Sequence, residues 1–239
     1  MDKVNVLGVE FDNVTMQEAL DRCQKFMESK KGNMIVTPNP EIVMLARKDE
    51  SFRKNINSAD LVIPDGIGVI KAANILKTPL KERVPGYELI CNILQSESIK
   101  DKKVYILGAK PGVAERAKEN IQNKYKVEVV GTHDGYFKEE ETDGIVKEIS
   151  QSGANILLVG MGMKKQEEFI LKNLDKLNVK IAIGCGGSID VFAGIVQRAP
   201  KFWIEHNLEW LYRLLKQPQR IPRMMVLPQF LMIAIFKRK

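Results

Sequence analysis

The sequence predicts an α/β fold in which a mostly parallel, Rossmann-like sheet carries helices on both faces. Three observations support this fold. Of the 239 residues, 44% are hydrophobic, which is enough to fill a sizeable core. Short apolar runs alternate along the chain with amphipathic helical segments. Several of these runs are apolar throughout, as expected for parallel strands covered on both faces.

The predicted strands are short and spread along the first four fifths of the chain. They cover residues 33–37, 60–63, 103–108, 127–131, 155–160 and 180–184. A small β element precedes them in the opening segment VNVLGVEFDNVT. Thr15 follows that element, and Glu18 stands three residues later, so the pair predicts a capping box at the first helix.

Amphipathic helical patterns lie between the strands. They cover residues near 15–30, 40–57, 66–76, 86–97, 112–125, 140–152 and 164–175. Strands joined by such crossovers run parallel, so their carboxyl ends meet at one edge of the sheet. Open α/β sheets bind their ligands at that edge.

The charge divides the chain into two predicted parts, an α/β catalytic domain over 1–195 and an appendage over 196–239. The net charge is +7. Residues 1–195 hold 28 basic and 28 acidic side chains, whereas residues 196–239 hold nine basic and two acidic ones. The whole excess therefore lies in the appendage, which points to a local anionic partner and not to a protein that is basic throughout.

The appendage has the composition of a membrane-surface segment. Leu208, Leu211, Leu214 and Leu215 mark one apolar helical face, and Pro218 and Pro222 interrupt the helix. The apolar run 224–236 would span only about 20 Å as a helix, which is too short to cross a bilayer. With Trp203, Trp210, Tyr212 and a terminal KRK, it predicts peripheral contact with anionic lipid. An oligomer interface is an alternative use of the same apolar surface.

Two observations concern the compartment. The three cysteines form no CxxC pair and leave one over, which is typical of a reducing environment. The opening residues MDKVNVLGVEFD lack the pattern of a signal peptide. We therefore expect a peripheral protein on the cytoplasmic face of the membrane.

Candidate site residues stand after two predicted strands and within one loop. Thr37 and Asn39 in TPNPEI stand at a strand end, where Asn39 also fits the N-cap position before Pro40. Asp65 in IPDGIG is either a general base or an N-cap residue. Arg83 in RVPGYEL is available for an anion, or is an ordinary surface residue.

Three glycine-rich turns follow strands and open helices, namely GAKPG, GMGMKKQEE and GCGGSID. Such turns let a phosphate approach the backbone N–H groups of a helix start. They predict a nucleotide-binding edge, and Gln166 is placed to bind a base or sugar hydroxyl, although first-turn glutamines are also common structural choices. The residues expected at the nucleotide are Gly108, Pro111, Gly112, Gly162 and Gly186.

The usual sequence patterns for binding a metal ion or a nucleoside triphosphate are missing. No two of its aspartates form a DxD motif, its two histidines and three cysteines have no zinc-ligand spacing, and there is no GxxxxGK[ST] loop. Arginines and helix N-termini must therefore neutralise any bound diphosphate. Arg213, Arg220 and Arg223 offer such charges on one approximate helical face.

The chain resembles the WecG/TagA/CpsF glycosyltransferases, glycosyltransferase family 26. The resemblance runs in family order from about residue 33 to 223. It departs from the family pattern at Met163, where Ser or Pro is common, and at Asn207, where Gly often precedes LEW. The stretches that carry it are TPNPEI, PDGIG, RVPGYEL, LGAKPGVAE, GMGMKKQEEFI, GCGGSIDVFAGIVQRAP and NLEWLYRLLKQPQRIPR.

The resemblance implies an inverting, metal-independent transferase without cofactors. It implies transfer of an N-acetylmannosamine-type sugar from a UDP donor to N-acetylglucosamine on a polyprenyl diphosphate. By resemblance, Asp65 is the base that deprotonates the acceptor 4-hydroxyl, and a C-terminal lid brings arginines to phosphate. The residues implied to bind substrate are Thr37, Asn39, Arg83, Gln166, Arg213, Arg220 and Arg223.

Alternatives to this interpretation stay open. Within the family, the TagA branch of wall teichoic acid linkage-unit synthesis is favoured over the WecG branch. The WecG branch uses a uronic acid donor, which calls for a further cation. Outside the family, GAKPG also suits a dinucleotide-dependent oxidoreductase, and the basic tail suits a non-catalytic membrane or nucleic-acid adaptor. We expect no nucleic-acid partner.

Overall fold

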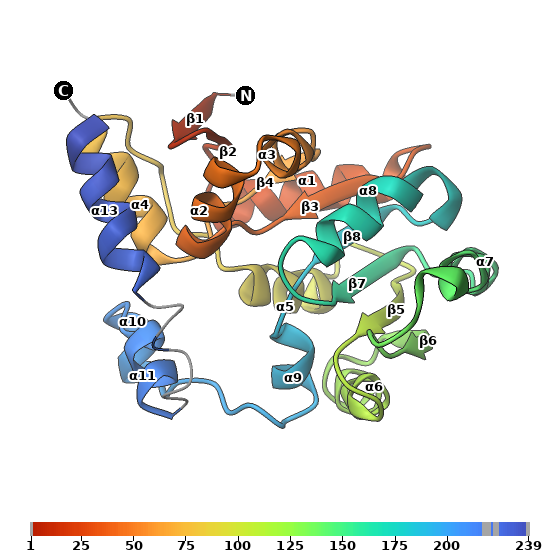
Figure 1. Ribbon diagram of the computed structural model, residues 1–239. Coiled ribbons are helices and arrows are strands. Elements are labelled where there is room, and N and C mark those ends of the chain that lie inside the picture. The colour runs from red at the N-terminus through yellow and green to blue at the C-terminus, as the bar shows by residue number, and fades with distance from the viewer. Residues whose placement is uncertain (1, 217–220, 222–224, 238–239) are drawn as a thin grey trace.

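A computed structural model describes residues 2–216, 221 and 225–237, with the side chain of Arg213 left out (Figure 1). Its centre is a six-stranded sheet with strand order β4-β3-β8-β7-β5-β6, in which each pair of neighbours runs parallel. The strands are β3 (Asn33–Val36), β4 (Leu61–Val62), β5 (Lys103–Gly108), β6 (Glu128–His133), β7 (Ile156–Gly160) and β8 (Ile181–Gly184). The predicted α/β class and parallel sheet are confirmed.

A small antiparallel hairpin, β1 (Lys3–Val6) and β2 (Val9–Asp12), protects the edge strand β4. Asp12 is 2% exposed, and its Oδ2 accepts a hydrogen bond of 2.9 Å from the backbone N–H of Val62. The Asp12 side chain thus satisfies a backbone N–H group that a further strand would otherwise bond. This protects the edge of β4 from pairing with another chain.

Helices cover both faces of the sheet, as predicted. One face packs against α1, α5, α6 and α9, and the other against α2, α3, α4, α7, α8 and α13 (Figure 1). Along the strands, successive apolar side chains alternate between these two cores, which is why the buried stretches of the strands are apolar on both faces. The helices are α1 (Met16–Glu28), α2 (Pro40–Lys48), α3 (Glu50–Asn57), α4 (Ile67–Ile75), α5 (Gly86–Gln95), α6 (Val113–Tyr125), α7 (Thr142–Gln151), α8 (Lys165–Leu177), α9 (Ser188–Phe192), α10 (Lys201–Glu205), α11 (Glu209–Lys216) and α13 (Val226–Lys237), with the 3-10 turn η1 (Glu139–Glu141) before α7.

Local capping explains where several helices begin. Thr15 and Glu18 form the predicted capping box at α1, and Asn39 caps α2 ahead of Pro40. The helix expected over 40–57 is instead two helices. Asp49 ends α2 and caps α3, and its Oδ1 accepts a hydrogen bond of 3.0 Å from the N–H of Phe52.

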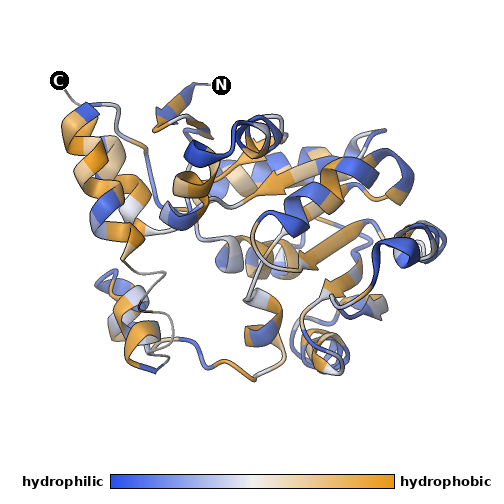
Figure 2. Ribbon diagram, in the orientation of Figure 1, coloured by the Kyte–Doolittle hydropathy of each residue, from blue (hydrophilic) through white to orange (hydrophobic). Residues whose placement is uncertain are grey.

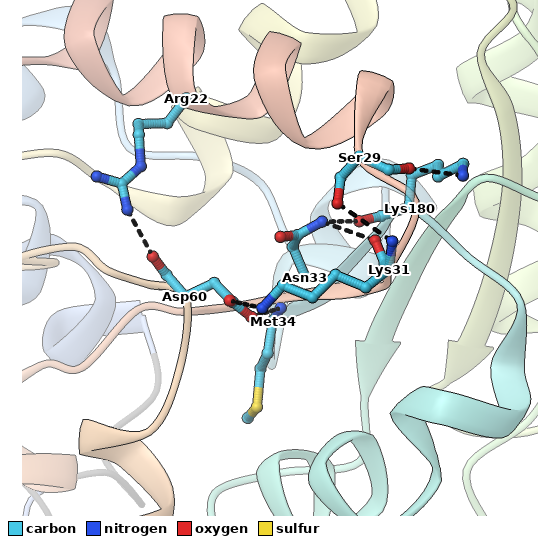
Figure 3. A network of polar contacts seen from close by, with 7 residues as sticks. All are labelled: Arg22, Ser29, Lys31, Asn33, Met34, Asp60 and Lys180. Atoms are coloured by element: carbon cyan, nitrogen blue, oxygen red, sulfur yellow. Dashed lines mark hydrogen bonds and ion pairs between the residues drawn. The ribbon is translucent and has the colours of Figure 1, made fainter.

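The polar network in Figure 3 joins the amino ends of β3, β4 and β8. The Oδ2 of Asp60 accepts a hydrogen bond of 3.0 Å from the backbone N–H of Met34, and its Oδ1 pairs with Lys31. Asn33 donates to the carbonyl oxygens of Lys31 and Lys180. These bonds join β3 to the segments that enter β4 and β8, at the end of the sheet away from the glycine-rich turns.

The C-terminal residues form two separate structures. Helices α10 and α11 form a corner, whereas α13 packs against α2 and α4 (Figure 1). Phe230 and Ala234 of α13 are fully buried in the same core as those helices. Leu215 differs from its predicted apolar neighbours and is 64% exposed. The predicted breaks at Pro218 and Pro222 lie outside the described residues.

Candidate active site

A cavity with a volume of about 620 cubic ångströms opens at the carboxyl edge of the sheet. Turns after β3, β4, β7 and β8 form its floor, and residues of α5, α9 and α11 contribute to its walls. This is the edge at which parallel sheets bind ligands. Seven of the predicted site residues line it, namely Thr37, Asn39, Asp65, Arg83, Gln166, Gly162 and Gly186.

Asp65 lies in a loop that is held between two others. Its backbone N–H donates to the carbonyl oxygen of Pro38 at 3.3 Å, and Val84 donates to the carbonyl oxygen of Pro64 at 3.0 Å. Gly66, at φ 98°, is the N-cap residue of α4, so Asp65 does not take the N-cap position that was its alternative role. Its half-buried side chain lines the cavity.

Thr37 and Asn39 have structural contacts as well as a place in the cavity. The Thr37 hydroxyl donates to the carbonyl oxygen of Gly184 at 3.3 Å, which links the ends of β3 and β8. Thr37 also packs so closely on Gly86 that a Cβ there would lie 2.8 Å from its Cγ2. The Oδ1 of Asn39 accepts the N–H of Ile42 at 3.0 Å. Both residues therefore have fixed orientations.

Gln166 is buried at the start of α8, and its amide is held at both ends. Its Nε2 donates to Glu167 Oε1 at 2.7 Å, and its Oε1 accepts the N–H of Gly186 at 3.1 Å. Glu167 is 1% exposed, and its Oε2 accepts the N–H of Lys164. Burial raises the pKa of the Glu167 carboxyl above its ordinary value. Gln166 thus fixes the GCGGSID turn beside the cavity.

The GAKPG turn does not line this cavity. Gly108, at φ 141°, packs against β7 so tightly that a Cβ would lie 2.5 Å from the carbonyl oxygen of Gly160. Gly112 adopts φ 81° as the N-cap residue of α6. Backbone conformation and packing therefore explain why glycine occupies these two positions. The contacts of Gly108, Pro111 and Gly112 with a nucleotide stay predictions.

Arg83 is the only one of the predicted arginines whose side chain falls within the described part of the chain, and it lines the cavity. Arg220 and Arg223 lie outside the described residues. The backbone of Arg213 belongs to α11, but its side chain is also outside the description. The predicted common face of these three arginines stays a prediction.

Several cavity residues were not predicted as site residues. Tyr87 and Glu88 belong to RVPGYEL, and Trp210 was assigned only to the membrane surface. The sequence contains a signal for all three residues, because they lie within the motifs RVPGYEL and NLEWLYRLLKQPQRIPR. Glu41, Lys165 and Ser188 are in the first turns of helices, and Asn207 and Glu209 precede Trp210.

Asn207 adopts a left-handed backbone conformation, with φ 57°. Asparagine is among the non-glycine residues that tolerate this region best. The same conformation is one that glycine adopts without strain.

Charge and thiol chemistry limit what the cavity can do. Its described lining includes four carboxylates, Glu41, Asp65, Glu88 and Glu209, but only two cationic side chains, Arg83 and Lys165. Cys185 also lies in the lining, and burial raises the pKa of its thiol to about 12. At neutral pH this thiol is protonated and is a poor nucleophile, so the carboxylates are the better candidates for proton transfer.

The chain matches the model of the glycosyl transferase WecG/TagA/CpsF family over residues 4–239. It is 40% identical to the N-acetylglucosaminyldiphosphoundecaprenol N-acetyl-beta-D-mannosaminyltransferase of Staphylococcus aureus strain MRSA252, over 99% of this chain and 94% of that protein. Its identity to the proteins of the same name from strains MW2 and NCTC 8325 is 39%, with the same coverage.

Proposed function

Because this chain belongs to the WecG/TagA/CpsF family of glycosyltransferases, we propose that it transfers N-acetylmannosamine from UDP-N-acetylmannosamine to N-acetylglucosamine on undecaprenyl diphosphate. The product carries a β-1,4 linkage and belongs to the linkage unit of wall teichoic acid. The observation that carries the proposal is the cavity, which gathers Asp65, Arg83 and Asn39 from separate loops at the ligand-binding edge.

The proposed reaction is a single displacement with inversion. The Asp65 carboxylate accepts the proton of the acceptor 4-hydroxyl as that oxygen attacks the anomeric carbon. The bond between this carbon and the β-phosphate oxygen breaks at the same time, and UDP leaves with the electron pair. The fixed loop around Asp65 supports this role, because a base must be held in place against the attacking hydroxyl.

Four other residues are proposed to hold the sugars and the donor diphosphate. Because the Oδ1 of Asn39 caps α2, its Nδ2 is the group that would donate to a sugar oxygen. The Thr37 hydroxyl donates to Gly184 and would accept from substrate. Arg83 would pair with phosphate. Gln166 would act mainly by holding the turn at Gly186 against the donor.

The charge balance of the cavity supports a role for the C-terminal arginines. Both substrates carry a diphosphate, yet carboxylates outnumber cations in the described lining. Further positive charge is needed, and we assign it to Arg213, Arg220 and Arg223. Gly162, in the turn after β7, would supply a backbone N–H group to the nucleotide phosphates, whereas the N–H of Gly186 is donated to Gln166 and positions its turn beside them. For Gly108, Pro111 and Gly112, contact with the nucleotide stays a prediction.

We propose that the reaction needs neither a metal ion nor a cofactor, because the sequence lacks a DxD motif. Within the described residues, no group of three or more His, Cys, Asp or Glu side chains is arranged to hold a metal ion. The assay below tests metal dependence directly with EDTA.

Contact with the membrane is proposed to involve α13. Met225, Met232, Ile235 and Phe236 are each more than half exposed at or along this helix, and Figure 2 shows it as largely apolar. Across the described residues, no helix combines the length and apolarity that a bilayer crossing requires. On the strength of these exposed apolar side chains, we propose peripheral binding at the cytoplasmic face of the membrane, with Lys237 near anionic headgroups.

The test is a transfer assay with a short-chain lipid diphosphate that carries N-acetylglucosamine. UDP-N-acetylmannosamine and UDP-N-acetylmannosaminuronate are compared as donors, each with and without EDTA. We expect transfer from the first donor that is unaffected by EDTA. Transfer only from the uronate would assign the chain to the WecG type, and loss of transfer with EDTA would overturn metal independence.

A further inference from the structure

We propose that Arg198 is a positioning residue that fastens the cap, defined as residues 201–216, to the wall of the cavity. It does so through Glu88 and Tyr87, at the start of α5. The inference rests on the proposed function only for its kinetic consequences, and the contacts themselves can be tested without substrate.

Arg198 makes two contacts with the first turn of α5. Its Nη2 forms an ion pair with Glu88 Oε1, and both side chains are less than one-third exposed. Its guanidinium carbon lies 4.8 Å from the centroid of the Tyr87 ring, in the range of a cation–π contact. Partial burial and a planar partner make this pair stronger than an exposed ion pair.

The aromatic partner is itself fixed to the body of the protein. The Tyr87 ring packs on Phe192 with centroids 4.8 Å apart, and Tyr125 meets the edge of Phe192 at 6.4 Å. The carbonyl oxygen of Phe192 accepts a hydrogen bond of 2.8 Å from Asn120 Nδ2. Arg198 therefore attaches to a cluster that joins α5, α6 and α9.

Arg198 stands at the root of the cap. Only Ala199, which is buried, and Pro200 separate it from α10. Beyond α10, the chain turns at Asn207 and brings Glu209 and Trp210 to the cavity. A shift at Arg198 would thus be transmitted to the residues that close this side of the cavity.

The ion pair also changes the charge of the cavity. Glu88 lines the cavity, so without Arg198 its carboxylate would face a diphosphate substrate uncompensated. Removing Arg198 should therefore weaken substrate binding in two ways, by loosening the cap and by adding repulsion. The two effects can be separated, because Glu88→Gln removes only the charge of the carboxylate.

The two tryptophans of the chain, Trp203 and Trp210, are both in the cap, so tryptophan fluorescence, excited at a wavelength that tyrosine does not absorb, reports on the cap alone. In Arg198→Ala we expect acrylamide to quench this fluorescence more strongly, with unchanged far-UV circular dichroism. We expect KM to rise about tenfold, the change produced by a loss of about 1.4 kcal/mol, and kcat to change less. Arg198→Lys should recover part of both effects, because it keeps the charge but not the planar contact.

The double variant Arg198→Ala with Glu88→Gln should lower KM relative to Arg198→Ala while quenching stays high. Lys201→Ala is the matched control, because Lys201 lies in the same cap and its ion pair with Glu205 is exposed. It should behave like the unmodified protein. Unchanged quenching in Arg198→Ala would overturn the proposal even if the protein catalysed another reaction, since that measurement needs no substrate.

Discussion

Leu227 of α13 lies directly against Gly68, the third residue after Asp65. A Cβ placed on Gly68 would come within 2.7 Å of Leu227 Cδ1 and 2.6 Å of Pro40 Cγ. The C-terminal helix therefore rests on the start of α4, directly after the loop that carries the proposed base. A change at Gly68 should affect both the packing of α13 and the position of Asp65.

Gly68→Ala should lower the free energy of unfolding by about 1–3 kcal/mol, because the added methyl group overpacks this contact. It should also reduce the transfer rate. Urea unfolding and the transfer assay measure the two effects. Gly144→Ala is the control, since Gly144 lies in α7 with open space around its Cα, and alanine there should stabilise by about 0.5–1 kcal/mol. Equal stabilities of the two variants would contradict the packing argument.

Asp65→Asn should reduce turnover by roughly 10²–10⁴-fold, because the amide cannot accept the proton of the acceptor hydroxyl. Its unfolding midpoint should stay close to that of the unmodified protein, since the loop is held by backbone hydrogen bonds. Initial rates at saturating substrate give the comparison. Near-normal turnover would remove Asp65 from the role of base.

Asp60→Ala should lower the stability of the protein and leave its turnover unchanged, the reverse of the result expected for Asp65→Asn. The change leaves the backbone N–H of Met34 without its acceptor and removes the ion pair with Lys31, which should cost about 1–3 kcal/mol of stability (Figure 3). The turnover of the folded enzyme should be unchanged, because this network lies at the far end of the strands from the cavity. Denaturant unfolding and kcat at a temperature where the variant is fully folded test this contrast. A large loss of kcat would mean that the two ends of the sheet are coupled.

Glu167 should make the protein less stable as the pH rises. Burial raises the pKa of its carboxyl in the folded state, so the folded protein holds this proton more tightly than the unfolded chain does. The resulting stabilisation is present below the ordinary pKa of 4.5 and is lost as the pH rises through the higher folded value. Other carboxyl groups have opposite shifts, so the comparison between variants is the informative one.

The variant Glu167→Gln should lack this pH-dependent stabilisation. The difference in unfolding free energy between the variant and the unmodified protein should therefore change with pH above 4.5. Urea titrations at a series of pH values measure it. The control is Glu168→Gln, whose side chain is about one-third exposed. A difference that is constant with pH would show that Glu167 does not titrate differently in the folded state.

Most of the fold could be predicted from local patterns. The sequence predicts all six strands of the main sheet to within two residues at each end, because each contains a short apolar run between turn residues. The predicted helix 40–57 was too long, since its apolar periodicity continues through Asp49. An aspartate followed by a new helical turn was the available signal, and its N-cap role becomes visible only in the structure.

The site was predicted less completely, because its parts are far apart in the sequence. Motifs at strand ends indicated Thr37, Asp65 and Gln166, since parallel strands bring their carboxyl ends together. The pairing of Arg198 with Glu88 spans 110 positions, and no local pattern indicates it. Likewise, the glycines of GAKPG suggest phosphate binding, whereas Gly108 is explained by its contact with β7.

The adjacency of β3 and β8 has a consequence for how the protein is made. Thr37 and Gly184, which meet across this pair of strands, are 147 positions apart. The floor of the cavity therefore cannot form until more than three quarters of the chain has left the ribosome, and Arg198 and the cap follow later still. Until then, β3 has an unpaired edge that is exposed to other nascent chains. Premature termination should thus yield an inactive, aggregation-prone fragment and not a partly active enzyme.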